Sequence, residues 1–135
     1  MAANPVVIEL GGQKILWSSD MKVVSASRFL SSSIGNPRAL RDVQDADYQV
    51  PVGKVFRLLE CVINGAGSGF IEGQLYNTSS SSGSATADAI ELIGAGENQV
   101  VHFATEHNVP AGNYITGDGY GNGLYAKVIG IEMDA

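Results

Sequence analysis

The sequence predicts an all-β protein, either a jelly roll or a β-sandwich, with an extended N-terminal arm. Two observations lead to this prediction. The 135 residues include 17 glycines and many serines, and both residue types interrupt helices. Short runs rich in valine and isoleucine recur between turns that contain glycine or proline, which is typical of strands. With 44% hydrophobic and only 16% charged residues, the chain can bury the core of one domain.

The first strands are expected in a hairpin near the N-terminus. Residues 6–10 (VVIEL) and 14–17 (KILW) are short apolar runs that flank the turn dipeptide Gly11-Gly12. This spacing is that of a β-hairpin. Residues 21–25 form another short strand candidate.

Irregular structure is expected in the residues that follow this hairpin. Residues 25–35 (SASRFLSSSIG) are rich in serine, and we interpret them as an extended arm or loop. Residues 36–41 predict one short helical turn. Asn36 can serve as its N-cap, and Pro37 would then take the first helical position, where its missing N–H costs nothing.

The β domain proper is predicted from Tyr48 onward. Its strand candidates are apolar or alternating runs between turn residues: 55–64, 70–77, 89–93, 99–105, 113–116 and 124–133. Residues 89–93 fit a helical turn equally well. The run 124–133 is long and β-branched, which favours a central position in a sheet. The low-complexity segment 78–87 and the glycine-rich segment 117–123 predict exposed loops.

One short pattern occurs twice, as residues 50–53 (VPVG) and 109–112 (VPAG). Proline keeps the residue before it extended, and the glycine two positions later permits a positive φ. Both copies precede a strand candidate. We therefore interpret them as one corner design used twice, rather than as a duplicated domain.

Charge divides the chain unevenly. Residues 1–41 carry five basic and two acidic side chains, whereas residues 42–135 carry three basic and twelve acidic ones. An acidic body repels nucleic acid and anionic membranes, so neither is an expected partner. The basic first segment favours an acidic protein surface, including that of a neighbouring copy, although ordinary scatter of charge explains it equally well. We place the boundary at residue 47, between an N-terminal arm or hairpin (1–47) and a β-sandwich (48–135).

Residues with catalytic or metal-binding chemistry are few and scattered. Cys61 lies in an apolar run, which predicts a small buried hydrophobe. His102 and His107 are five residues apart, a spacing that does not place them on one face of a strand. Asp118 and Asn122 provide too few carboxylates for a calcium site. The sequence therefore predicts no enzyme, no cofactor and no metal site.

Two glycine-rich or aromatic patterns have alternative interpretations. The glycines of residues 65–69 (GAGSG) superficially match a phosphate loop, but the chain that follows is strand-like, which favours a turn. Exposed aromatic side chains stack on sugars, but they also fill cores and subunit interfaces. The candidates are Trp17, Tyr76, Tyr114, Tyr120 and Tyr125.

Residues 48–58 (YQVPVGKVFRL) resemble the strand opening of β-rich phage virion proteins, namely capsid decoration (cement) proteins and the head domains of tail fibres. The resemblance covers about residues 48–135 and includes no catalytic residues. It implies a structural protein, made in the host cytoplasm and located on the capsid surface of the virion. It also implies a homo-oligomer, with a trimer favoured, that bridges subunits of the major capsid protein.

Our first functional hypothesis is a decoration protein whose N-terminal segment makes the adhesive contact. The expected interface residues are apolar anchors and two arginines: Val6, Val7, Ile8, Leu16, Trp17, Phe29, Leu30, Arg38 and Arg41. The alternative is a receptor- or carbohydrate-binding module of a tail fibre, with the loops 78–87 and 117–123 against the ligand. A third possibility, a jelly-roll enzyme, has no positive feature in the sequence.

Overall fold

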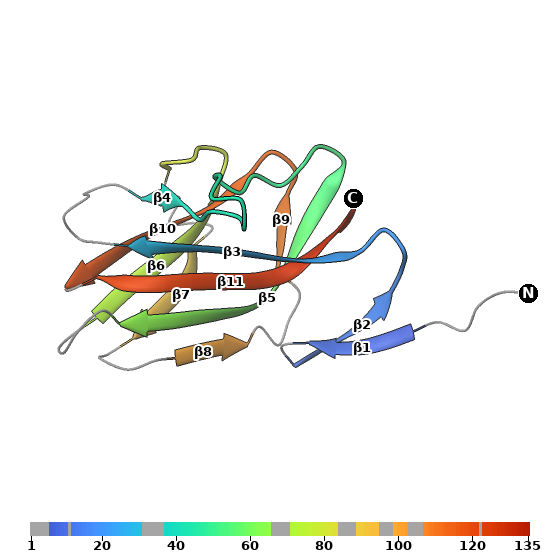
Figure 1. Ribbon diagram of the computed structural model, residues 1–135, viewed down its shortest axis with the longest axis horizontal. Helices are drawn as coiled ribbons and strands as arrows, with labels where there is room; N and C mark the ends of the chain where they lie inside the picture. The colour runs from blue at the N-terminus through green and yellow to red at the C-terminus, as the bar shows by residue number, and fades with distance from the viewer. Residues whose placement is uncertain are drawn as a thin grey trace, which may run out of the picture.

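The computed structural model describes residues 6–10, 12–30, 37–65, 71–83, 89–94, 99–102, 107–121 and 123–135. It confirms the all-β prediction, because every regular element in these ranges is a strand (Figure 1). In these ranges no helix has the length and hydropathy that a membrane crossing requires. The strands are β1 (Val6–Leu10), β2 (Gln13–Trp17), β3 (Lys22–Leu30), β4 (Arg38–Ala39), β5 (Lys54–Gly65), β6 (Ile71–Thr78), β7 (Ala89–Gly94), β8 (Gln99–His102), β9 (Asn108–Pro110), β10 (Tyr114–Gly121) and β11 (Leu124–Asp134).

The strands form two large antiparallel sheets and one small one. The first large sheet has the order β3-β11-β5-β8, with β9 also paired to β5, and the second has the order β4-β10-β6-β7. The two sheets face each other across a shared core, so the domain is a β-sandwich (Figure 1). The third sheet is the β1–β2 hairpin, which lies at one end of the first sheet. The jelly-roll topology stays a prediction.

Strand β11 occupies the central position that its length and β-branching predict. It pairs with β3 on one side and β5 on the other. Leu124, Ala126 and Val128 alternate with more exposed neighbours and face the core. A β-bulge interrupts the pairing with β5, where Leu59 is the extra residue between the partners of Gly130 and Ile129.

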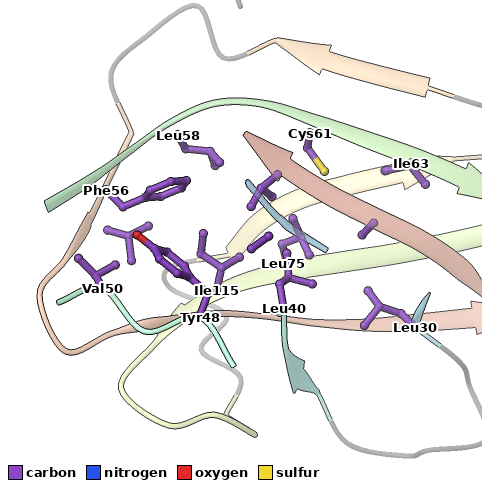
Figure 2. Close-up of a cluster of buried hydrophobic side chains, with 14 of the residues drawn as sticks. Leu30, Leu40, Tyr48, Val50, Phe56, Leu58, Cys61, Ile63, Leu75 and Ile115 are labelled. Atoms are coloured by element: carbon purple, nitrogen blue, oxygen red, sulfur yellow. The ribbon is translucent and has the colours of Figure 1, made fainter. Parts of the chain in front are cut away.

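The core is an apolar cluster between the two sheets (Figure 2). Phe56 and Leu58 from β5 are fully buried, as are Leu75 from β6 and Ile115 from β10. The Tyr48 ring meets the Phe56 ring edge-on, with 5.4 Å between their centroids. Removing each large apolar side chain from water contributes about 1.5–3 kcal/mol to folding. The cluster therefore holds the two sheets together.

The repeated Val-Pro corner is confirmed, and its two copies are neighbours. Gly53 and Gly112 have φ values of 78° and 84°, and each copy closes with a hydrogen bond to the carbonyl oxygen of its proline. These are the features of a type II turn. Two hydrogen bonds also join the copies to each other. The Val50 amide donates to the carbonyl oxygen of Asn113 at 2.9 Å, and the Gly112 amide donates to the carbonyl oxygen of Val50 at 2.8 Å. The shared design thus joins the start of β5 to the start of β10.

The predicted N-terminal arm is not confirmed. Residues 22–30 form β3, which pairs with β11 along its length, so the arm or loop interpretation of 25–35 is wrong for Ser25–Leu30. The rest of that segment lies outside the described residues. Serine lowers local preference for a strand, but the alternating Val24, Ala26 and Leu30 pack against the core, and this packing decides the conformation. Strands β3 and β4 thus lie in the two large sheets, although both come before residue 48.

The helical turn predicted at 36–41 is also wrong over its described residues. Arg38 and Ala39 form β4, which pairs with Gly117 and Thr116 of β10. Leu40 continues the extended chain and donates its amide to the carbonyl oxygen of Ile115 at 2.9 Å. Partners on a neighbouring strand outweigh the local capping signal, because the extended form pairs with β10 and buries both Ala39 and Leu40.

Most of the glycine-rich segment 117–123 is strand rather than loop. Residues 117–121 belong to β10 and pair with β6. A Cβ atom on Gly117 would lie 2.7 Å from Cδ1 of Leu30, and one on Gly119 would lie 2.7 Å from the Leu30 carbonyl oxygen. The glycines therefore allow β3 to approach β10 closely.

The other predicted strands have these outcomes. Residues 89–94 form strand β7, which resolves the choice between strand and helical turn. In the segment 99–105, residues 99–102 form β8, and residues 103–105 lie outside the described residues. Strand β9 has no counterpart among the predictions, since its three residues are too short to show a pattern.

Candidate functional site

The hairpin β1–β2 packs one of its faces on the first sheet, on the side away from the core. Ile15 of β2 is buried against Leu59 of β5 and Ile131 of β11. Ile8 and Trp17 are partly buried in the same cluster. Because Leu59 is the extra residue of the bulge, the bulge adds an apolar side chain to the surface that the hairpin covers.

A buried glutamine fixes the tip of the hairpin. Gln13 donates from Nε2 to the carbonyl oxygen of Leu58 at 3.3 Å, and its Oε1 accepts a hydrogen bond from Nε of Arg57 at 2.9 Å. A buried amide with satisfied partners is directional, so it sets where the hairpin lies as well as holding it.

The connection from the hairpin to β3 is fixed by Asp20. Its carboxylate accepts hydrogen bonds from the Ser18 hydroxyl and from the amide of Asp134, the latter at 2.8 Å. These two hydrogen bonds lower the pKa of Asp20 below its usual value, with the Ser18 bond the larger cause. Lys54 in turn pairs with Asp134 at 2.5 Å. The base of the hairpin is thus tied to the end of β11.

The opposite face of the hairpin is exposed and partly apolar. Val7 and Leu16 are directly opposite each other in the register, and they are 62% and 60% exposed. Glu9 and Lys14 form the next pair on the same face. Val6, at the end of β1, is 56% exposed. Because side chains alternate along a strand, Val6 lies on the same side as Ile8 and not beside Val7. We call Val7 and Leu16 the hairpin patch. Clustered exposed apolar side chains on an edge element are a feature of interaction surfaces.

A second apolar pair lies on the same sheet face as the docked hairpin. Phe29 of β3 and Tyr125 of β11 are opposite each other in the register, and both are exposed. The Tyr125 hydroxyl donates to Oγ of Ser27 at 2.8 Å. This pair and the hairpin patch are both on the outer side of the first sheet.

Of the predicted interface residues, Leu30 requires a correction. It is only 2% exposed and belongs to the core, where it contacts Gly117 and Gly119 of the other sheet. Its position at the end of an alternating strand turns it inward, so it is not an anchor. Ile8 and Trp17 lie on the inward face of the hairpin and are partly buried, whereas Phe29 is exposed.

The two predicted arginine contacts differ from each other. Arg41 pairs with Asp45 at 3.2 Å and with Asp47 at 3.7 Å, and Arg28 also reaches Asp47 at 3.7 Å. The acidic turn that follows the basic segment therefore folds back on it, and two of the five basic side chains of that segment, Arg28 and Arg41, are paired with acidic side chains of this turn. Arg38 is exposed at the start of β4.

A cleft with charged and apolar walls lies between the start of β3 and the turn 42–47, and no sequence pattern predicted it. Its volume is about 240 Å³. Tyr48 donates a hydrogen bond from its hydroxyl to Oε2 of Glu132 at 3.0 Å, and Nζ of Lys22 lies 3.7 Å from Oε1. Burial, and secondly this hydrogen bond, raise the pKa of Tyr48. Tyr48 and Glu132 are 84 positions apart, so no local motif could have identified the pair.

Within the described residues, those considered for catalysis are not assembled into a site. Cys61 is buried, as predicted, and burial raises the pKa of its thiol to about 12, so the thiol is un-ionised at neutral pH. Asp118 belongs to β10, and Asn122 lies outside the described residues. No group of three or more His, Cys, Asp or Glu side chains that could hold a metal occurs in the described ranges. Residues 66–69 and 84–87, from two predicted turns or loops, lie outside those ranges.

No family model, curated protein or solved structure matches this chain.

Proposed function

We propose that this protein is a virion structural protein of the capsid decoration (cement) class, attached to the outer capsid surface through the β1–β2 hairpin. The observation that supports this most is the hairpin patch. A two-stranded ribbon that covers one sheet face still exposes Val7 and Leu16 on its other side, where they do not pack against the sandwich. Apolar side chains placed this way favour contact with another protein.

The expected strength of the contact follows from the exposed apolar surface. Burying a valine or leucine side chain against a partner contributes about 1.5–3 kcal/mol. The hairpin also has two outer strand edges, and an unpaired edge can accept a strand from a partner. The Phe29–Tyr125 pair adds a separate apolar area on the same side of the first sheet. The sandwich serves as the rigid carrier of this surface.

The proposed partners are the major capsid protein and other copies of the chain, with a homotrimer as the favoured assembly. Association also stabilises the folded chain, because a partner that binds only the folded form shifts the folding equilibrium by mass action. The proposal includes no catalytic step and no cofactor.

The test is retention on purified capsids of the virus that encodes the protein. The double variant Val7→Asp/Leu16→Asp places two charges in the hairpin patch and leaves the inward face intact. We expect a loss of affinity of roughly tenfold or more. Val52→Asp is the matched control, because Val52 is 95% exposed in the turn before β5. Undiminished retention of the double variant would contradict attachment by the hairpin.

A carbohydrate-binding module of a tail fibre is the second candidate, and the Phe29–Tyr125 pair favours it. Two exposed aromatic rings from neighbouring strands match the stacking surfaces that bind sugars. A glycan array with the wild type and with Phe29→Ala/Tyr125→Ala tests this. Binding that the double variant loses would support it, and an empty array at high protein concentration would reject it.

A further inference from the structure

The cleft beside β3 has the size and charge of a site for a single cationic side chain. We propose that it binds the charged end of a lysine or arginine side chain, an ammonium or a guanidinium group, presented by a partner protein. This proposal is independent of the hairpin contact, since none of the cleft residues belongs to β1 or β2. It adds a second, charged contact to the apolar one.

The floor of the cleft is the carboxylate of Glu132. This side chain is only 9% exposed, and the Tyr48 hydroxyl holds Oε2 at 3.0 Å. The Lys22 ammonium is 3.7 Å from Oε1, but 69% of its side chain is exposed, so the pair is a weak surface ion pair. Each carboxylate oxygen accepts more than one hydrogen bond. Glu132 is therefore a fixed anion that can accept a second cation.

The walls combine a second anion with apolar side chains. Asp42 accepts hydrogen bonds on Oδ1 from the amides of Gln44 and Ala46, at 2.9 and 3.1 Å, which fixes its carboxylate. Two acids and one base thus line the cleft, and this balance favours a cation. The apolar residues of the lining include Val23 and Val43, and Val43 is 82% exposed. They can contact the methylene stem of a lysine or arginine while the charged end meets Glu132.

The volume limits the ligand to one side chain. The 240 Å³ of the cleft corresponds to about eight water molecules. This is below the range of about 300–1,000 Å³ that is usual for whole small-molecule ligands. The described residues hold no group of three metal-ligating side chains here or elsewhere, so the carboxylates are not arranged for a metal ion.

The test uses n-butylammonium, which is a lysine side chain without its backbone, and n-propylguanidinium as the arginine equivalent. Both are titrated into the full-length protein at pH 7 and followed by amide chemical shifts. We expect saturable shifts at Ser25, Val43 and Gln44, with a dissociation constant on the order of 10 mM. n-Butanol, which has the same apolar chain without the charge, should give no saturable shift at these amides.

Variants separate the site from general charge effects. Val43→Lys places a like charge at the mouth of the cleft and should weaken binding at least about threefold, while its exposure leaves the fold intact. Val52→Lys adds the same charge at a site outside the cleft and should leave binding unchanged. Glu132→Gln keeps an acceptor for the Tyr48 hydroxyl but removes the negative charge, and it should abolish binding of both cations.

Four results would overturn the proposal. The first is no saturation with either cation up to 100 mM, a concentration set at about ten times the expected constant. The second is equal shifts from n-butanol, and the third is equal weakening by Val43→Lys and Val52→Lys. Binding of 1,4-diaminobutane about tenfold tighter than n-butylammonium would assign the cleft to a free diamine and so overturn the side-chain occupant. None of these results bears on the hairpin assay, so the two proposals fail separately.

Discussion

The sandwich and the hairpin use apolar residues in opposite ways. In the sandwich, Phe56 and Leu58 lie between two sheets and are completely buried. In the hairpin, Ile15 is buried, while Val7 and Leu16 face outward from the same two strands. The comparison indicates that the buried apolar side chains of the sandwich stabilise the fold, whereas Val7 and Leu16 of the hairpin are not packed against the rest of the chain. Substitutions should therefore separate stability from attachment.

The largest effect is expected in the sandwich. Phe56→Ala removes a buried ring that packs against Tyr48 and leaves a cavity between the sheets. We expect the free energy of unfolding to fall by about 3–5 kcal/mol. Urea denaturation followed by circular dichroism measures this. A loss below about 1 kcal/mol would show that the core is not where the structure places it.

A smaller and more local effect is expected from Ile15→Ala. This change removes the one fully buried apolar side chain in the described hairpin and should lower the local stability by about 2–4 kcal/mol. Hydrogen exchange should show lost protection in β1 and β2 before any change in β5 or β11. Leu16→Ala, on the same strand but facing outward, is the control and should change stability by less than about 0.5 kcal/mol. Equal effects of the two variants would contradict the assignment of the hairpin faces.

Tyr48→Phe tests the polar pair that joins the core to the cleft. The variant leaves Glu132 without its hydroxyl partner, which costs about 1–3 kcal/mol. The folded state raises the pKa of Tyr48 above the ordinary value of 10.0, so its contribution is complete below pH 10 and is lost as the pH rises above it. The stability of the wild type should therefore fall more steeply above pH 10 than that of the variant. Parallel pH profiles would show that the phenol is not buried.

The smallest effect is expected at the charged turn. Asp45→Asn removes the 3.2 Å ion pair with Arg41, both of whose side chains are exposed, and asparagine tolerates the positive φ of 61° at this position. The change in unfolding free energy should be within about 1 kcal/mol and should shrink further at high salt. Thermal unfolding at low and high ionic strength measures it. A salt-independent loss above about 2 kcal/mol would mean that the turn has a structural role of its own.

The sequence predicted those parts of the fold that local patterns determine. The length and β-branching of 124–133 predicted a central strand. The Val-Pro-x-Gly pattern predicted two corners, because proline and glycine act on the backbone within a few residues. The hairpin was predicted from its Gly-Gly turn for the same reason. None of these predictions needed knowledge of a distant partner.

The parts that failed depend on distant contacts. Arg38 and Ala39 have a helix-capping signal before them, but β10 provides strand partners from almost 80 residues away. The local sequence around Leu30 does not indicate its burial, which comes from β10 of the other sheet packing against it. The cleft was missed because Tyr48 and Glu132 meet only in the folded sheet. Nothing in the spacing of these residues reveals such pairs.

The proposed function requires that the hairpin, and not the body of the sandwich, contacts the capsid. The most direct measurement is amide hydrogen exchange of the full-length protein, free and bound to purified capsids. If the hairpin makes the contact, binding should slow exchange mainly in residues 6–10 and 13–17, with smaller changes at Phe29 and Tyr125. Slowed exchange confined to β6 and β10 of the second sheet, with the hairpin unchanged, would contradict it.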